Sequence, residues 1–168
     1  LFSLVRDRAD SPAPLLQAMN DMLVGRNISQ FITASYSCID LDARKIVYAN
    51  AGHPPFFILP RDAAEPIVAD AEGRAMGWTN DIRCAQRTLP LRPGDRLVIY
   101  TDGITECRSA RGELFGEKRF ASCLREWRDL PGGELARRLG VRLTAWRKPA
   151  GDFEDDITLL IIDLNGNE

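Results

Sequence analysis

Two spacings of apolar residues divide the chain into predicted helices and strands. Apolar positions three and four residues apart predict amphipathic helices over 12–24, 120–127 and 135–146. The first helix begins at Pro12, which tolerates the first helical position, directly after Ser11, a favourable N-cap. The apolar faces of the three helices are formed by Leu15, Met19, Met22, Leu23, Phe120, Cys123, Leu124, Trp127, Leu135, Leu139, Leu143 and Trp146.

Alternating apolar and polar residues, or short apolar runs, predict strands between and after these helices. The strands are expected over 31–41, 46–51, 56–59, 82–89, 96–100 and 157–164. A polar turn at 42–45 joins the first two into an antiparallel hairpin, and the proline-glycine turn at 92–95 joins the fourth and fifth into another. The last strand is almost continuously apolar, which predicts a central strand covered on both faces.

Helices gathered at both ends of a run of antiparallel strands predict an α+β layered sandwich rather than an alternating parallel fold. The stretch 60–80 is expected to be rich in loops. A chain of 168 residues fits one domain. Because it begins at Leu1 rather than methionine, and because 1–8 has the pattern of the last turns of a helix, we expect a fragment of a longer protein.

The composition is that of an ordinary globular domain, with 45% hydrophobic and 27% charged residues. The 22 basic and 24 acidic residues give a net charge of −2, which argues against nucleic acid and membrane partners. No apolar run approaches the roughly 20 residues of a membrane helix, so a cytoplasmic protein is expected. The four scattered cysteines lack the paired spacing of zinc sites and are expected to be reduced and mostly buried.

The first candidate for chemistry lies where the 96–100 strand ends, at Asp102 and Gly103. A carboxylate on this rigid platform, beside a glycine that admits a ligand, suits a hard cation such as Mg²⁺ or Mn²⁺. Taken alone, an Asp-Gly pair is more often a simple turn. Tyr100 stands where the Asp-x-Asp phosphatases of the haloacid-dehalogenase type need their aspartyl nucleophile, so that mechanism is excluded.

A second candidate is the acidic cluster 152–156, which leads directly into the last apolar strand. Such clusters are often only solvated loops. Adjacent Asp155 and Asp156 at the entrance of a buried strand are nevertheless costly without a cation or hydrogen-bond donors. Two carboxylate groups distant in sequence, each at a strand end, are the arrangement that a site for two divalent ions requires.

His53 is the single histidine, within the Asn50–Pro55 corner. Since no cysteine or second histidine is placed to join it, we expect it to hold the turn, with a supporting role near metal or substrate as the alternative. The tryptophans at 78, 127 and 146 lack the interleaved basic residues of a surface for single-stranded nucleic acid. Trp78, Trp127 and Trp146 are therefore predicted to be packing residues.

Six stretches taken in order resemble a known family, the metal-dependent PPM (protein phosphatase 2C-like) serine phosphatases, in the branch of RsbU and stage II sporulation protein E. The stretches are Phe31–Ala34, Tyr48–Pro55, Leu91–Asp95, Tyr100–Glu106, Gly112–Gly116 and Asp155–Thr158. Each is weak alone, but six in the expected order, over nearly the whole chain, form a specific signal.

This resemblance implies a four-layer α-β-β-α sandwich of two antiparallel sheets, with two Mn²⁺ or Mg²⁺ ions holding the water that attacks phosphoserine or phosphothreonine. By motif, Asp102 and Asp155 would be metal ligands, and Gly103, Asp156 and His53 would support the site. The implied substrate is a phosphorylated anti-anti-sigma-type regulator in a bacterial partner-switching pathway, with an upstream sensor or receiver domain in control. A homodimer is compatible with this resemblance.

The chain departs from the family pattern at one point, because the early Asp-Gly-type motif whose aspartate bridges both metals has no counterpart in it. That aspartate and the first strands are expected upstream, and the 168-residue piece is expected to be a weak or inactive catalyst. Two alternatives stay open. One is a catalytically silent partner-binding module of the same fold, and the other, ranked last, is a calcium-stabilised structural domain that uses Asp152–Asp156.

Overall fold

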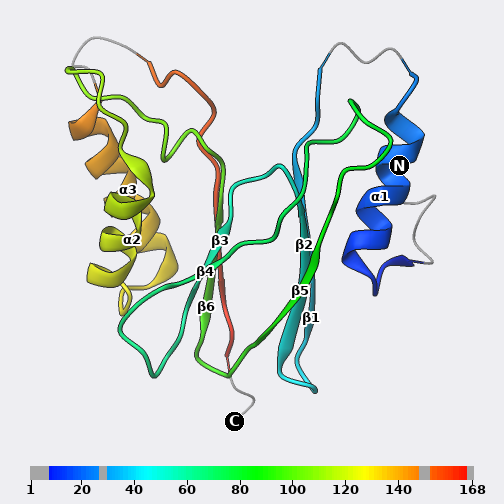
Figure 1. The fold of residues 1–168 in the computed structure, drawn as a ribbon. Coiled ribbons are helices and arrows are strands. Elements are labelled where there is room, and N and C mark those ends of the chain that lie inside the picture. Colours follow the sequence, from blue (N-terminus) through cyan, green and yellow to red (C-terminus); the bar gives the residue numbers. More distant parts are fainter. Residues whose placement is uncertain (1–7, 27–29, 148–151, 166–168) are drawn as a thin grey trace. The chain divides into compact units, whose positions relative to one another are not determined.

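The computed structural model describes residues 8–26, 30–147 and 152–165. It divides into two compact units, here called unit 1 (Leu1–Pro55 and Asp70–Arg92) and unit 2 (Phe56–Ala69 and Pro93–Glu168). Each unit combines an antiparallel sheet with one or two helices (Figure 1), so the α+β class expected from the sequence is confirmed. Of the helix end expected over 1–8, residues 1–7 lie outside the described residues.

Unit 1 is a three-stranded antiparallel sheet covered by one helix (Figure 1). Its elements are α1 (Pro12–Leu23), β1 (Ala34–Asp40), β2 (Lys45–Ala51) and β5 (Gln86–Pro90), with strand order β1-β2-β5. The predicted hairpin is confirmed, since Asp40 pairs with Lys45. Leu15 and Leu16 are buried against small residues of β2, which lets α1 lie close to the sheet.

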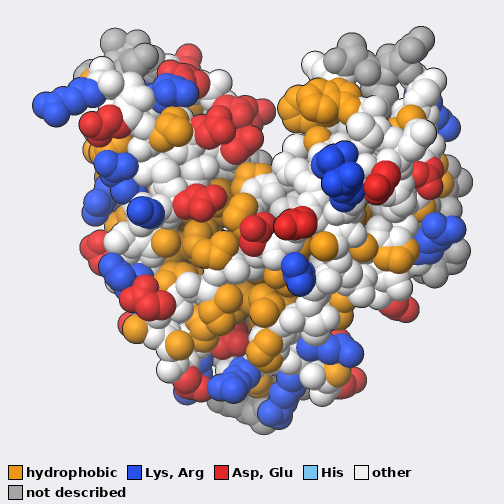
Figure 2. All heavy atoms as spheres, viewed as in Figure 1, with side chains coloured by type: hydrophobic (Ala, Val, Ile, Leu, Met, Phe, Trp, Pro, Cys, Tyr) orange, Lys and Arg blue, Asp and Glu red, His pale blue; other side chains and the backbone are white. Residues whose placement is uncertain are grey.

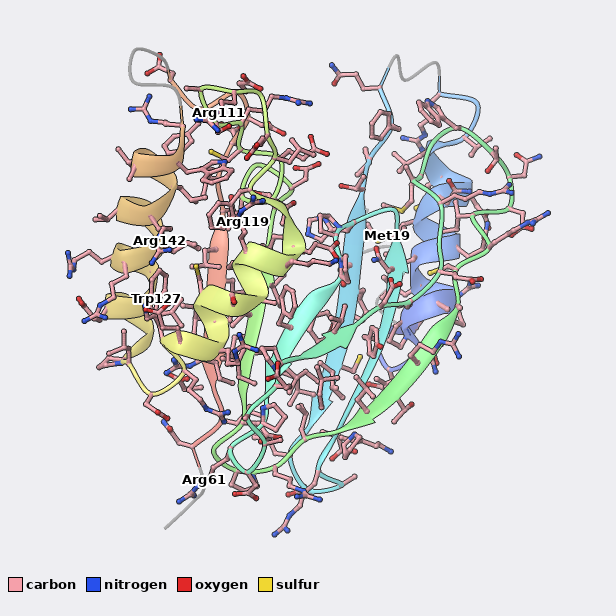
Figure 3. All side chains as sticks on the ribbon, turned by 60° about the vertical axis from the view of Figure 1, so that its left-hand side comes forward. Met19, Arg61, Arg111, Arg119, Trp127 and Arg142 are labelled. Atoms are coloured by element: carbon pink, nitrogen blue, oxygen red, sulfur yellow. The ribbon has the colours of Figure 1, made fainter. Side chains whose placement is uncertain are left out.

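Unit 2 is a four-stranded antiparallel sheet with two helices. Its elements are β3 (Phe56–Leu59), β4 (Ile67–Ala69), β6 (Arg96–Tyr100), α2 (Gly116–Glu126), α3 (Gly132–Trp146) and β7 (Leu159–Asp163), with strand order β4-β3-β6-β7. The predicted apolar faces of both helices are buried. Figure 3 shows Arg142 of α3 beside Trp127, which follows α2, and the guanidinium carbon lies 5.5 Å from the ring centroid.

The second predicted hairpin is wrong. β5 pairs with β2 in unit 1, whereas β6 pairs with β3 and β7 in unit 2. Residues 92–95 do form a turn, but this turn connects strands of two different sheets. The N–H of Leu91 donates to the carbonyl of Arg44 in unit 1, and three residues later the N–H of Gly94 donates to the carbonyl of Leu164 in unit 2.

The prediction of a central last strand is also wrong, because among the described strands β7 borders β6 alone. Over Leu159–Ile161 the apolar side chains nevertheless alternate between half-buried and exposed positions. Leu159 and Ile161 pack on the core, while Leu160 between them is 50% exposed. The three-residue strand β4 lies inside the stretch expected to be loops, and its shortness leaves too little periodicity to detect.

The tryptophans differ from one another. Trp127 is buried and Trp146 half-buried, as predicted, but Trp78 is 66% exposed, so its prediction as a packing residue is wrong. All four cysteines are free thiols, of which Cys107 and Cys123 are buried. Within the described part of the chain, no helix combines the length and apolar character needed to cross a membrane.

Candidate functional site

The two acidic motifs lie side by side in unit 2. Tyr100, the last residue of β6, pairs with Leu159, the first residue of β7, so the segments just beyond this pair adjoin. The N–H of Thr101 donates to the carbonyl of Thr158 at 3.1 Å, and the N–H of Thr158 donates to the Thr101 hydroxyl at 2.9 Å. The strand pairing therefore brings together residues more than fifty positions apart in sequence.

Gly103 sets how closely these segments approach. A Cβ built at this position would lie 2.5 Å from the carbonyl oxygen of Asp156, closer than any real Cβ contact. That same oxygen accepts a hydrogen bond from the Thr101 hydroxyl at 2.9 Å. Any larger residue at position 103 would push the Asp155–Asp156 segment away, so the glycine is needed for close backbone approach.

The carboxylates at this junction, here called the acidic junction (Thr101–Gly103 and Asp155–Thr158), are exposed. The Asp102 carbonyl accepts the N–H of Glu106 at 2.7 Å, which fixes the turn that carries the side chain. Within the described residues its carboxylate has no hydrogen bond or ion pair. One oxygen of Asp155 accepts the N–H of Asp156 at 2.7 Å. The carboxylate oxygens of Asp102 and Asp155 therefore face solvent from backbone segments that hydrogen bonds hold in place.

These residues fit part of a site for a hard divalent ion. Carboxylate oxygens are the ligands that Mg²⁺ and Mn²⁺ prefer, and the close backbone packing holds Asp102 and Asp155 on adjoining segments. Across the described ranges, no group of three or more His, Cys, Asp or Glu side chains converges. Two aspartates alone fall short of the ligand number that two divalent ions need, so the acidic junction does not by itself form such a site.

Residues around the acidic junction hold the neighbouring segments in place and are not themselves candidate metal ligands. Arg108 lies 3.5 Å from the carboxylate of Glu154, and Arg147 stacks over Phe153 at 5.2 Å, which tethers the preceding part of the acidic cluster. Tyr100 is 2% exposed, and burial raises the pKa of its hydroxyl far above the ordinary value. Its ring packs against Phe57 and Phe120 in the core of unit 2.

His53 belongs to unit 1 and is held through its backbone. Its N–H donates to the Asn50 side-chain oxygen at 2.8 Å, and its carbonyl accepts from the Asn50 amide at 2.5 Å. The imidazole Nδ1 lies 3.5 Å from the Thr33 hydroxyl. This geometry matches the expected turn at 50–55.

Sequence reasoning missed several residues that the structure places in or beside these sites. Thr101 bonds across the acidic junction, and the signal that could have found it is a hydroxyl residue directly before the Asp-Gly pair. Arg74 and Arg83 line a cavity of about 490 Å³ with His53. No spacing in the sequence marks these two arginines, because separate loop segments bring them to the cavity.

Comparison with known proteins gives a consistent result. The family model described as stage II sporulation protein E (SpoIIE) matches residues 1–165. The chain is 33% identical over 105 residues to phosphoserine phosphatase RsbU of Bacillus subtilis, which covers 61% of this chain and 31% of RsbU. It is 28% identical over 134 residues to phosphoserine phosphatase RsbP of the same organism, covering 80% of this chain and 31% of RsbP. The chain thus spans less than a third of these relatives.

Two solved structures share the fold. The SiaA-PP2C domain of Pseudomonas aeruginosa aligns with a TM-score of 0.78 and 23% identity, over 97% of this chain and 68% of that domain. The manganese-presoaked phosphatase domain of SpoIIE from Bacillus subtilis aligns with a TM-score of 0.73 and 19% identity, over 99% of this chain and 74% of that domain. At these identities the likeness establishes the fold.

Proposed function

Because the chain belongs to the stage II sporulation protein E family, we propose that it forms part of a metal-dependent protein-serine/threonine phosphatase domain. Its substrate in this proposal is phosphoserine on a regulatory protein of the anti-anti-sigma type. Two relatives named as phosphoserine phosphatases support the reaction class. The observation that carries the proposal is the acidic junction, where Asp102 and Asp155 stand on segments locked together by Gly103 and Thr101.

In this proposal Asp102 and Asp155 hold Mn²⁺ or Mg²⁺, two ions in the complete domain. When bound, such ions supply positive charge against the phosphoryl oxygens and activate water for attack. The chain's own contribution is positional. The Asp156 carbonyl accepts a hydrogen bond from the Thr101 hydroxyl, and Gly103 has no side chain that would keep this carbonyl away. These contacts hold the segments that carry Asp102 and Asp155 at a fixed spacing. His53 has a supporting role, with its backbone held by Asn50.

The remaining ligands come, in this proposal, from a segment upstream of residue 1, which carries the bridging aspartate and the first strands of the domain. An upstream sensor or receiver domain then controls activity. The relatives' greater length is consistent with this organisation. The 168-residue chain alone is therefore expected to bind metal weakly.

The test is Mn²⁺-dependent hydrolysis of p-nitrophenyl phosphate and of a phosphoserine peptide, by the 168-residue chain and by a version extended upstream by several dozen residues. We expect activity in the longer protein. In the longer protein, Asp102→Ala and Asp155→Ala should each lower kcat more than about 100-fold. This loss exceeds what is typical when the changed residue only contacts a metal ligand. The circular dichroism spectrum should be unchanged.

Asp152→Ala is the matched control, because Asp152 is an exposed carboxylate of the same acidic cluster that lies outside the acidic junction. Its activity should stay within about two-fold of wild type, as for ordinary surface substitutions. Wild-type turnover in the Asp102 or Asp155 variant would remove the assigned roles.

A catalytically silent partner-binding module is the second candidate function. It would apply if the bridging aspartate of the family's early Asp-Gly-type motif, which has no counterpart in residues 1–168, is also missing from the upstream sequence. This alternative predicts that the upstream-extended protein neither hydrolyses p-nitrophenyl phosphate nor binds Mn²⁺ in isothermal titration calorimetry.

A further inference from the structure

The side chain of Thr101 continues the pairing of β6 and β7 beyond the last strand residues. The two strands end where Tyr100 pairs with Leu159. One residue further, the Thr101 hydroxyl accepts the N–H of Thr158 and donates to the carbonyl of Asp156, both at 2.9 Å. Since an amide N–H only donates and a carbonyl only accepts, the direction of both bonds is fixed. The hydroxyl therefore takes the place of backbone groups in linking the two segments.

The Asp156 carbonyl is the point at which this link comes close to both candidate metal ligands. It accepts the Thr101 hydroxyl, and a Cβ built at Gly103 would lie 2.5 Å from its oxygen. Asp102 stands between these two residues in the chain. Asp155 directly precedes Asp156, and its carboxylate accepts the Asp156 N–H at 2.7 Å. The main chain of each aspartate is thus one residue away from the same contact.

Gly103 and Thr101 contribute to this contact in different ways. The glycine permits close approach but adds no attraction, because it has no side chain. The attraction comes from the hydrogen bond of the Thr101 hydroxyl. Figure 2 shows Asp and Glu side chains exposed at this end of unit 2. Carboxylates on adjoining segments repel one another when no cation is bound, so the hydroxyl holds the segments together against this repulsion.

We propose that Thr101 is a positioning residue for the divalent cation, whose hydroxyl sets the affinity for metal rather than the rate of the metal-loaded domain. Both bonds of the hydroxyl go to main-chain groups, so it acts through the segments that carry Asp102 and Asp155. Once a cation neutralises the carboxylates, the segments depend less on this link. The inference rests on the proposed function, because it assumes that the acidic junction takes part in metal binding.

The first test needs no metal and uses the 168-residue chain in EDTA. Thr101→Val keeps the branched shape and removes the donor and the acceptor, whereas Thr101→Ser keeps both. Hydrogen exchange followed by NMR should be about 10-fold faster at the Thr158 amide in Thr101→Val, the equivalent of one net hydrogen bond, and near wild type in Thr101→Ser. The contact is partly open to solvent, so water can satisfy the freed groups and the urea midpoint should stay near wild type.

The second test measures metal affinity and turnover separately in the upstream-extended protein. Isothermal titration calorimetry should show the Kd for Mn²⁺ rising about 10-fold in Thr101→Val, the lower end of the range for residues that support metal ligands. At saturating Mn²⁺, kcat for p-nitrophenyl phosphate should fall no more than about two-fold, because the lost interaction acts on binding. Thr101→Ser should restore the affinity.

Thr144→Val is the matched control, because Thr144 is an exposed threonine on α3 of the same unit, outside the acidic junction. Its Thr158 exchange and Mn²⁺ affinity should equal those of wild type. The positioning role is overturned by an unchanged Thr158 amide or wild-type Mn²⁺ affinity in Thr101→Val, by a loss of kcat that saturating Mn²⁺ does not remove, or by a failure of Thr101→Ser to rescue. A wild-type extended protein that binds no Mn²⁺ overturns the proposed function as well, and that result is recognised without any variant.

Discussion

The two units bury their sheets in different ways. Unit 2 uses two helices and a cluster of aromatic rings, in which Phe120 lies 5.5 Å from Phe57 and 4.8 Å from Tyr100, centroid to centroid. Unit 1 uses one helix and aliphatic or small side chains, and closes the remaining space with a loop held by the buried amide of Asn20. Unit 2 is therefore packed mainly by aromatic rings, whereas unit 1 combines an aliphatic core with directional hydrogen bonds from Asn20.

The two units also differ in the side chains that they expose to solvent. In unit 2 the backbone and hydroxyl bonds of Thr101 hold the acidic junction, and carboxylates face outward. In unit 1 polar groups are turned inward, and the apolar ring of Trp78 faces outward. A loop held by buried polar side chains can thus keep an apolar ring exposed.

Truncation of the unit 2 core should have the largest effect on stability. Phe120 is fully buried, so Phe120→Ala removes a ring that packs edge-on against Phe57 and Tyr100 and leaves a cavity. We expect a loss of about 3–5 kcal/mol in the free energy of unfolding, measured by urea denaturation. Hydrogen exchange should show the loss of protection first in unit 2.

Val141→Ala is the control for this truncation. Val141 is 60% exposed on α3 of the same unit, and its removal should change the free energy of unfolding by less than about 0.5 kcal/mol. A near-wild-type urea midpoint for Phe120→Ala would mean that aromatic packing does not dominate unit 2.

The success of sequence reasoning depends on whether a feature is recorded in a short stretch of sequence. Helix faces such as Phe120 and Leu124 were predictable because burial of a continuous core face imposes a 3.6-residue period on the residues. The Asp102 and Asp155 candidates came from short local strings at strand ends, and the β6–β7 pairing brings those strings together.

The errors came from long-range effects that no local window records. The turn at 92–95 has ordinary hairpin residues, yet its two sides bond to different sheets. The lack of interleaved basic residues predicts packing for Trp78, but its loop is held by Asn20, 58 positions earlier, whose side-chain amide donates to the adjacent carbonyl of Thr79. Polar contacts between a helix and a distant loop carry no periodicity.

Loss of the hydrogen bonds between Asn20 and the 77–80 loop should destabilise unit 1 by an intermediate amount. Asn20→Ala leaves the Gly77 N–H and the carbonyl of Thr79 without their buried partner. We expect a loss of about 1–3 kcal/mol from these unsatisfied groups, with faster hydrogen exchange confined to unit 1.

Gln17→Ala separates burial from hydrogen bonding as the cause. Gln17 also donates to the Asn80 carbonyl, at 2.6 Å, but the contact is exposed, so water can replace the lost bond. Its effect should be clearly smaller than that of Asn20→Ala. Equal losses for the two variants, or exchange that rises equally in both units, would contradict the view that buried directional bonds hold unit 1.

The smallest effect should come from the charged surface of α3, which tests whether unit 2 relies on ion pairs as well as packing. Hydrogen bonds from Arg137 and then Arg138 lower the pKa of Glu134 from 4.5 to about 2. A carboxyl whose pKa is lower in the folded state stabilises the fold above its unfolded pKa, and this contribution disappears as the pH falls through the folded one. The difference in thermal midpoint between wild type and Glu134→Gln should therefore be small and constant above pH 4.5 and shrink towards pH 2. Glu126→Gln, which removes a carboxylate with no ion pair among the described residues, should show no such trend. A gap that widens at low pH would assign the stabilisation to something other than the Glu134 carboxylate.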